Sequence, residues 1–165
     1  MQHTEIEFLL LDKNNASAVK ECAKLMSTSE PWITLRRTFG DVIKIIEDDT
    51  SEVHLMKLQN KMIGFAIIKM RGAFVGYIQS VVIEPRYRGK GIGEWFIGYL
   101  ERRILSEQPN IFICVSSFNR DAKRLYERLG YETIGELKDY IVRGYSEILM
   151  RKTVSPFSEF HPGRK

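Results

Sequence analysis

The sequence predicts a mixed α/β (α+β) domain with a central, mainly antiparallel sheet of six to seven strands, flanked by about four helices. Three observations support this fold class. Three apolar segments between residues 53 and 83 are joined by tight turns, which is typical of an antiparallel meander. Residues 92–108 carry apolar side chains with the period of an α-helix. The 165 residues, 44% of them hydrophobic and 28% charged, suit one globular core.

Composition also limits the classes of function. The net charge of +4 is spread along the chain, so nucleic-acid binding is not indicated, whereas a small polyanionic ligand suits this charge. Cys22 and Cys114 occur without CxxC spacing or a nearby His cluster, so we expect neither a disulfide nor a metal site. No secretion signal is evident, and no stretch has the roughly 18 apolar residues of a membrane span. We therefore expect a cytoplasmic protein without a membrane segment, with one domain at residues 1–152 and a tail at 153–165.

The first half of the chain is expected to hold two helices and four strands. A strand at 6–11 precedes DKNN, whose side chains can cap a helix that ends near Met26. Pro31 breaks the helical pattern, and a second short helix follows near residues 42–46. From Glu52 onward the pattern changes to three strands with tight turns between them, at 53–58, 62–70 and 74–83.

The second half begins with the longest predicted helix, at 92–108, which ends before Pro109. A short buried strand at 111–117 follows. The next helix is expected to open at Asn119 and to stop at Gly130, because Asn is a favoured N-cap and Gly a favoured residue just past a helix end. Two closing strands are expected before the tail, at 131–137 and 140–152.

The segment VVIEPRYRGKGIGEWF, residues 81–96, is the most informative part of the chain. An apolar strand ends at Glu84 and Pro85, and three glycines alternate directly before the long helix. Glycines let the backbone approach a ligand closely, and a helix start presents unpaired N–H groups with a partial positive charge. The loop therefore predicts a phosphate site. The GxxxxGK(S/T) pattern is absent, and GxGxxG fails because Glu94 occupies its last position.

Two motifs then indicate a family. The spacing Arg88-x-x-Gly91-x-Gly93 after a strand resembles the signature of the GNAT acetyltransferase superfamily. A second stretch, NRDAKRLYERLGY at residues 119–131, is similar to the family motif that follows the fifth main strand. The order of elements up to about Lys152 resembles the family as well. The resemblance implies that two central strands splay apart, so that the pantetheine arm of coenzyme A can pair with exposed backbone like an added strand.

By this resemblance the chain is an N-acetyltransferase that passes the acetyl group of its co-substrate acetyl-coenzyme A directly to an amine, without a metal. The acceptor classes are a small-molecule amine, a polyamine, and a protein N-terminus or lysine. Some of the implied contacts also have simpler interpretations, since basic loop residues can be solvated and an Asn can merely cap its helix. The cofactor contacts implied by the resemblance are Val81, Val82, Ile83, Arg86, Arg88, Gly89, Lys90, Gly91, Ile92, Gly93, Asn119, Lys123 and Tyr126.

Tyrosines are the candidate catalytic residues. Tyr126 either packs on the apolar face of its helix or, by the resemblance, is the general acid that protonates the departing coenzyme A thiolate. A phenol with a pKa near ~10 keeps its proton at neutral pH. Tyr77 lies where some protein N-terminal acetyltransferases carry a catalytic Tyr, although aromatic packing explains it equally well. The resemblance also assigns the oxyanion-stabilising N–H to Val82 and its neighbours.

The general base is not identified by the sequence. Many family members carry a Glu or His on a splayed strand where this chain has Cys114, so we expect the acceptor to lose its proton through water. The segment between the first two helices commonly lines the acceptor pocket in the family, which makes Glu30 and Trp32 candidate substrate-binding residues. Asp139 and Glu147 are further carboxylates that either favour a cationic acceptor or lie at the surface.

Two other functions stay open at this point. A catalytically inactive acyl-coenzyme A sensor domain could keep the cleft without the chemistry, and Tyr126 argues against it. Nucleic-acid binding through the basic excess predicts a steep salt dependence of affinity, and no compact basic run favours it. The expected partner is a small-molecule or peptide amine, with a homodimer formed through the closing strands or the tail as a further expectation.

Overall fold

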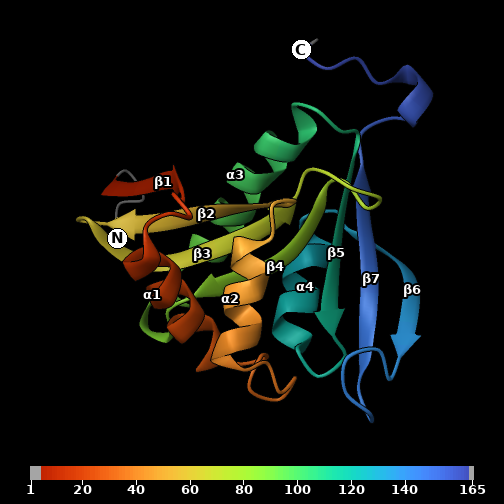
Figure 1. Ribbon diagram of the computed structural model, residues 1–165. Helices are drawn as coiled ribbons and strands as arrows, with labels where there is room; N and C mark the ends of the chain where they lie inside the picture. Colours follow the sequence, from red (N-terminus) through yellow and green to blue (C-terminus); the bar gives the residue numbers. More distant parts are fainter. Residues whose placement is uncertain (1–4, 164–165) are drawn as a thin grey trace.

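The computed structural model describes residues 5–163 as one seven-stranded sheet between two pairs of α-helices (Figure 1). The strands lie in the order β1-β2-β3-β4-β5-β7-β6, and every neighbouring pair is antiparallel except β4 and β5. This arrangement confirms the predicted fold class. The elements are β1 (Ile6–Leu10), α1 (Ala16–Ser27), α2 (Phe39–Glu47), β2 (Ser51–Leu58), β3 (Lys61–Lys69), β4 (Tyr77–Ile83), α3 (Ile92–Leu105), β5 (Asn110–Ser116), α4 (Arg120–Arg128), β6 (Glu132–Lys138) and β7 (Ser146–Thr153), with short 3-10 helices η2 (Pro85–Tyr87) and η3 (Phe157–Glu159).

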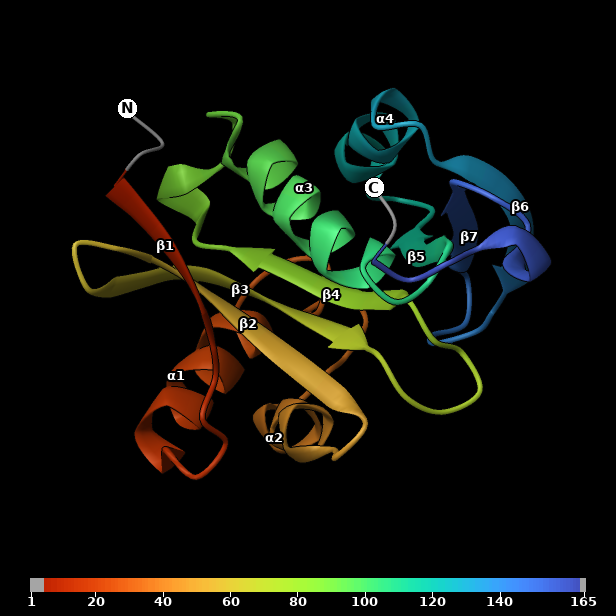
Figure 2. The same cartoon turned by 90° about the horizontal axis from the view of Figure 1, so that it is seen from above.

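The two faces of the sheet carry different helices. Seen from above, α1 and α2 cover one face and α3 and α4 cover the other (Figure 2). Met26 and Ile46 pack with Phe65 on the first face, whereas Phe96 and Leu100 belong to the core of the second. Burial of these side chains removes apolar surface from water, which is the main driving force for assembling the three layers.

The helix boundaries follow the predicted caps. The side chain of Asn15 accepts a hydrogen bond from the Ala18 amide at 3.1 Å and starts α1. Asn119 caps α4 through a longer bond of 3.4 Å from the Ala122 amide. Gly130 follows the end of α4 with a φ of +89°, a conformation that glycine adopts without steric cost.

Three predicted boundaries were wrong. The third meander strand begins at Tyr77 rather than at residue 74, because the chain turns at Gly76, where an added Cβ would lie 2.4 Å from the Asn110 carbonyl oxygen. The long helix ends at Leu105 rather than at 108. The last strand begins at Ser146 rather than at 140, because the Asp139 carboxylate accepts the Gly144 amide at 2.6 Å and closes a turn.

The central strands separate as the resemblance implied. β4 and β5 pair only at Tyr77 with Phe112 and at Ile78 with Ile113. Beyond Ile78, β4 stays paired with β3 up to Ile83, while β5 stays paired with β7 along its full length. One side of β4 therefore leaves its neighbour, and the sheet opens between β4 and β5.

The C-terminal segment leaves the sheet after β7. The Val154 amide donates to the Pro109 carbonyl at 3.0 Å, and the chain then projects away from the domain through η3 (Figure 1). The division into a domain ending at residue 152 and a tail from 153 stays a prediction. Within residues 5–163, no helix has the length and apolar character needed to cross a membrane.

Candidate active site

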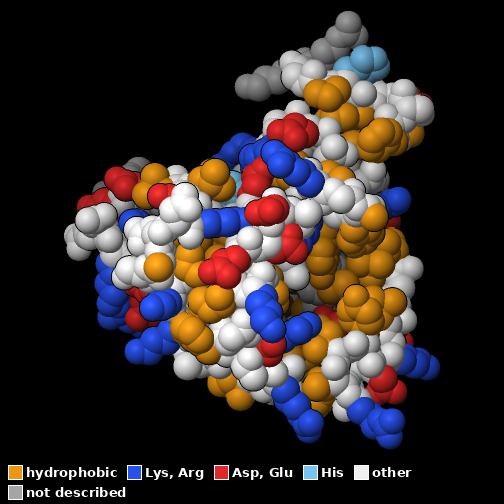
Figure 3. All heavy atoms as spheres, viewed as in Figure 1, with side chains coloured by type: hydrophobic (Ala, Val, Ile, Leu, Met, Phe, Trp, Pro, Cys, Tyr) orange, Lys and Arg blue, Asp and Glu red, His pale blue; other side chains and the backbone are white. Residues whose placement is uncertain are grey.

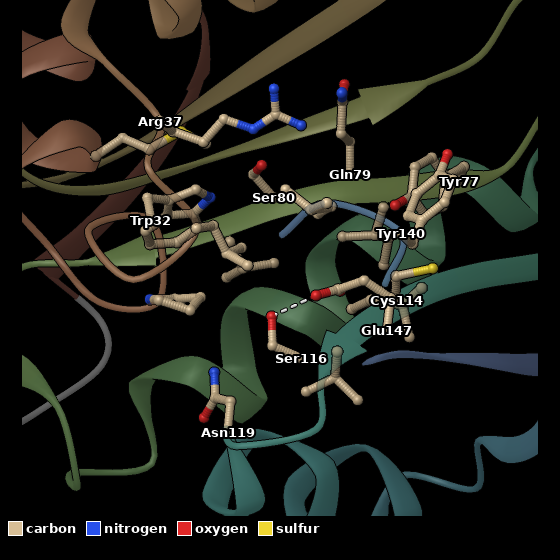
Figure 4. Close-up of a pocket in the computed structure, with 18 of the residues that line it drawn as sticks. Trp32, Arg37, Tyr77, Gln79, Ser80, Cys114, Ser116, Asn119, Tyr140 and Glu147 are labelled. Carbon is tan, nitrogen blue, oxygen red and sulfur yellow. Dashed lines mark hydrogen bonds between the residues drawn. The ribbon is translucent and has the colours of Figure 1, made fainter. Parts of the chain in front are cut away.

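A cavity of about 200 Å³ lies where β4 and β5 separate. Its walls come from the α1–α2 segment, β4, β5, α4, the β6–β7 turn and the start of β7. The close-up in Figure 4 shows the labelled polar side chains that surround it. In the space-filling view, hydrophobic side chains gather over β5, β7 and β6, on the side of the molecule next to this opening (Figure 3). The cavity between β4 and β5 thus contains polar side chains, and the surface beside it is hydrophobic.

The glycine loop ends in a helix N-terminus that no side chain caps. Gly91 is the N-cap of α3, with a left-handed φ of +77°, and it makes no side-chain capping bond. The first amides of a helix have no partner within it, so those of Ile92 and Gly93 can donate to a ligand. An added Cβ at Gly89 or Gly91 would meet no atom within 4 Å, so both face open space. These glycines are required by their positive φ rather than by crowding.

Basic side chains around the loop are held by different partners. Arg88 donates from Nε to the Ile83 carbonyl oxygen at 2.8 Å, which ties the loop to the end of β4. Arg86 forms an ion pair with Glu84 at 2.7 Å, and its guanidinium lies 4.9 Å from the ring centre of Tyr87. Lys90 lies over the same ring at 5.7 Å. The structure therefore groups the three predicted basic residues around one loop.

The other residues of β4 and the loop that were predicted to contact the cofactor differ in whether their side chains are accessible. The side chains of Val82 and Ile92 are buried in the core, so neither side chain can reach a ligand. The backbone of Val82 faces Phe65 of β3, whereas the amide of Ile92 lies at the start of α3. Val81 lines the cavity, and Ile83 ends the strand. An added Cβ at Gly93 would lie 3.4 Å from the Ile83 side chain, which is an ordinary van der Waals contact, so packing alone does not require glycine at this position.

The second motif places its residues at the other wall. Asn119 and Tyr126 line the cavity, whereas Lys123 pairs with Glu127 at 2.5 Å along α4. Tyr126 is only 9% exposed, and burial alone raises its pKa to about 12. Its hydroxyl therefore stays protonated at neutral pH and is a proton donor rather than a base.

Tyr77 and Cys114 lie together at the point where the two strands part. Burial raises the pKa of Tyr77 well above its usual range, and the neighbouring Cys114 thiol raises it further. Burial also raises the pKa of Cys114. Both side chains are neutral at physiological pH, so neither provides an ionised base in the cavity.

The segment between α1 and α2 contributes only part of what the sequence predicted. Trp32 is 9% exposed and lines the cavity. Glu30 is exposed, does not line it, and accepts a hydrogen bond from the Thr34 amide at 3.2 Å. Arg37, which the sequence did not single out, extends over the cavity from the same segment (Figure 4).

Glu147 is the carboxylate that the cavity contains. It lies on β7 directly opposite Ser116 of β5, and the Ser116 hydroxyl donates to its Oε1 at 2.6 Å (Figure 4). The residue is 5% exposed, and burial raises its pKa. Asp139, by contrast, is exposed in the β6–β7 turn. The sequence signal for Glu147 was a charged residue at the start of the apolar run ILM, where an alternating strand would bury it.

The described residues contain no group of three or more His, Cys, Asp or Glu side chains that could hold a metal ion. The polar groups of the site are thus a helix N-terminus suited to anions, a buried phenol, and a carboxylate on the far wall. A family model described as the acetyltransferase (GNAT) family matches residues 19–131, which include the glycine loop and Tyr126. The chain belongs to the GNAT family. The resemblance found in the two sequence motifs is confirmed.

Known relatives of this GNAT chain match most of it. The spermine/spermidine N(1)-acetyltransferase of Bacillus subtilis is 29% identical over 111 residues, which cover 57% of this chain and 71% of that protein. The mycothiol acetyltransferase of Mycobacterium leprae is 29% identical over 116 residues, covering 64% of this chain. The match spans 33% of that longer protein.

A solved structure of an aminoglycoside 6'-N-acetyltransferase complexed with coenzyme A has the same fold. It superposes with a TM-score of 0.70 at 18% identity and covers 91% of this chain and 98% of its own. The family match ends at Tyr131, before β6 and β7. Glu147 therefore lies outside the part of the chain that the GNAT model matches.

Proposed function

We propose that this chain is an acetyl-coenzyme A-dependent N-acetyltransferase that transfers the acetyl group directly to an amine. One observation carries the proposal. The uncapped N-terminus of α3 follows the end of β4 that separates from β5, and the cavity lined by Tyr126 lies between the same two strands. An anion-binding site and a buried proton donor at one opening suit an acyl donor that is a polyanion at one end and a thioester at the other.

The residues present fit coenzyme A. The amides from Gly89 to Gly93 would hold its pyrophosphate, since they lie at a helix N-terminus without a side-chain cap and Gly89 and Gly91 have open space around them. Arg86, Lys90 and Lys123 would add positive charge, although Lys123 would have to share its ammonium with Glu127. The side of β4 that leaves β5, presented by the backbone of Val81 and Ile83, would pair with the pantetheine arm as an added strand does.

The chain's own groups would act at defined atoms. Acetyl-coenzyme A, when bound, supplies the acetyl group as a reactive thioester. Tyr126 holds a proton at its hydroxyl, and its raised pKa keeps that proton in place until a thiolate develops nearby. The amide of Val81, a neighbour of Val82, is a candidate donor to the developing oxyanion, because the register with β3 directs the Val82 amide to Phe65 and the Val81 amide to the opening. Such a donor contributes about 3 kcal/mol in other acyl-transfer sites.

The acceptor class is an amine. The relatives carry names that refer to spermine and spermidine, mycothiol and aminoglycosides. The lining of the cavity, with one carboxylate and several aromatic side chains, is compatible with a cationic acceptor. The proposed acceptor class also includes the amine of a peptide. Cytoplasmic location, independence from metal and nucleic acid, and a homodimer stay predictions.

Thermal unfolding with acetyl-coenzyme A tests the donor site. A ligand that binds only the folded state stabilises it by about 2.7 kcal/mol at a hundredfold excess over its dissociation constant. We expect this stabilisation in the wild type and its loss in Gly91→Val, because a β-branched residue cannot adopt the φ of +77° without strain. Gly72→Val is the matched control, since Gly72 has a φ of +91° and also faces open space.

The control separates loss of the site from loss of stability. Both variants should unfold at a lower temperature without ligand, but only Gly72→Val should respond to acetyl-coenzyme A. Thiol release with spermidine, kanamycin and an alanine-terminated hexapeptide then tests transfer. Binding without thiol release from any amine would favour the inactive sensor, and no binding at millimolar ligand would contradict the proposal.

A further inference from the structure

Glu147 lines the cavity without an ion-pair partner among the described residues. Its carboxylate is held by the cross-strand bond from Ser116, and both residues are buried, at 5% and 4% exposure. Within residues 5–163, no Lys, Arg or His forms an ion pair with it. The positive charge of Arg37 lowers the pKa of Glu147, but only from a distance beyond that of an ion pair. A buried carboxylate without a paired cation is destabilising, which indicates a cationic ligand.

The other groups that face Glu147 do not provide an ionised base. Burial raises the pKa values of Tyr77, Cys114 and Tyr126, so all three are neutral near pH 7. Arg37 is a cation, and Tyr140, on the β6–β7 turn, is 66% exposed at the margin. Glu147 is thus the group in the cavity that combines a negative charge with access to the opening.

The carboxylate also has a free acceptor atom. Ser116 occupies Oε1, and no described residue donates a hydrogen bond to Oε2. A primary ammonium has three N–H donors and would satisfy this oxygen in a charge-assisted bond. Burial raises the pKa of Glu147 above its usual value, which suits a group that must take a proton and release it again.

We propose that Glu147, oriented by Ser116, binds the primary ammonium of the acceptor and accepts its proton. The inference rests on the proposed acetyl transfer and names the residue that binds and deprotonates the acceptor amine. Glu147 takes one proton from the ammonium, and the freed nitrogen lone pair bonds to the acetyl carbon. The carbon–sulfur bond breaks with its electron pair on sulfur, which receives the proton of Tyr126. Tyr126 regains a proton from the new amide nitrogen, and Glu147 releases its own to solvent.

Glu147→Gln tests the role because it keeps the shape and removes the charge. With acetyl-coenzyme A and whichever of spermidine, kanamycin and the alanine-terminated hexapeptide the wild type acetylates, we expect kcat/KM at neutral pH to fall about 100-fold or more. The acid limb of the pH profile, which reports ionisation of the base, should disappear. Glu136→Gln, at an exposed site on the neighbouring β6, is the matched control and should retain wild-type activity.

Arg37→Gln tests Glu147 through the position of the acid limb of the pH profile, which would not change if Glu147 had only a structural role. The positive charge of Arg37 lowers the pKa of Glu147, so its removal should shift the acid limb to higher pH. Ser116→Ala should shift the acid limb in the same direction. In the wild type the Ser116 hydrogen bond favours the ionised carboxylate, so its loss raises the pKa of Glu147.

The outcomes distinguish the two proposals. A wild type that acetylates an amine, with Glu147→Gln within threefold of it at every pH, overturns the role of Glu147 and leaves acetyl transfer intact. An acid limb that Arg37→Gln and Ser116→Ala leave in place overturns that role as well. A wild type that acetylates none of the three amines contradicts the proposed transfer and, with it, the proton-accepting role. Acetyl-coenzyme A should still raise the unfolding temperature of Glu147→Gln, which shows that the donor site is intact.

Discussion

Two carboxylates of the same sheet have opposite surroundings. Glu52 on β2 accepts two hydrogen bonds from Arg103, at 2.6 and 3.0 Å, and lies 3.2 Å from Nε2 of His54. The other nitrogen of His54 lies 3.1 Å from the hydroxyl of Tyr99. Each polar group in this cluster thus has a protein partner. The cluster ties β2 to α3 and needs no ligand to complete it.

The cavity cluster uses similar residue types and leaves them incomplete. Glu147 has Ser116 as its partner but no paired cation, and no hydrogen bond from the described residues affects the pKa of Tyr126. Since buried polar groups are normally satisfied, partners for these side chains can come from water or from bound substrates. The difference teaches that a functional site is recognised by what its side chains lack, more than by which side chains it contains.

The two tyrosines give the largest expected contrast. Tyr126→Phe should lower kcat for acetyl transfer by about 100-fold or more, because it removes the proposed proton donor while keeping the ring. Tyr99→Phe should leave kcat unchanged and destabilise the fold by about 1 kcal/mol, because it removes the partner of His54. Thiol release and thermal unfolding of both variants make the comparison. Equal activity in the two variants would contradict the role of Tyr126.

The two arginines give the next contrast. Arg103→Gln should destabilise the fold by about 1 kcal/mol, since it breaks a partly exposed ion pair at 2.6 Å and leaves Glu52 poorly compensated. A change of that size shifts the unfolding temperature by roughly 2–4 °C. Arg37→Gln should change stability by less than about 0.5 kcal/mol, because Arg37 forms no ion pair within the described residues. Equal shifts in unfolding temperature for Arg103→Gln and Arg37→Gln would contradict the claim that Glu52 is paired within the fold and Glu147 is not.

Local features of this fold could be predicted from the sequence. The caps at Asn15 and Asn119 and the glycine loop each depend on a few neighbouring residues, so their spacing was sufficient. The turn closed by Asp139 was missed, because its bond to the Gly144 amide leaves no trace in the apolar periodicity that predicted a continuous strand.

The cofactor-binding side of the site could be predicted from neighbouring residues, whereas the amine-binding side could not. The loop from Gly89 to Gly93 acts through its backbone and is contiguous in the sequence. Glu147 is opposed to Ser116 only by the register of β5 on β7, across 31 residues of chain. The sequence named Glu147 among several carboxylates and favoured Glu30, because it could not show that one is buried in the cavity and the other exposed.

The smallest expected effect is on the pH dependence of stability, where Glu147 and His54 should act in opposite directions. Burial raises the pKa of Glu147, so its favourable contribution is present below the unfolded pKa of about 4.3 and is lost as pH rises through the folded pKa. Glu147→Gln should therefore be more stable than the wild type at neutral pH, and this gain should shrink on acidification. Such a gain alongside lost activity is the usual trade-off at a functional site.

Burial lowers the pKa of His54, despite the opposing effect of Glu52, so the unfolded chain takes up a proton first as the pH falls below about 6.5. The wild type should lose stability in that range, and His54→Gln should lose less of it over the same range. Urea unfolding of the wild type and both variants between about pH 4.5 and 8 measures the two slopes. A wild type that is as stable as Glu147→Gln at neutral pH would mean that Glu147 is already compensated in the folded chain, as Glu52 is, and that its cavity does not call for a cation.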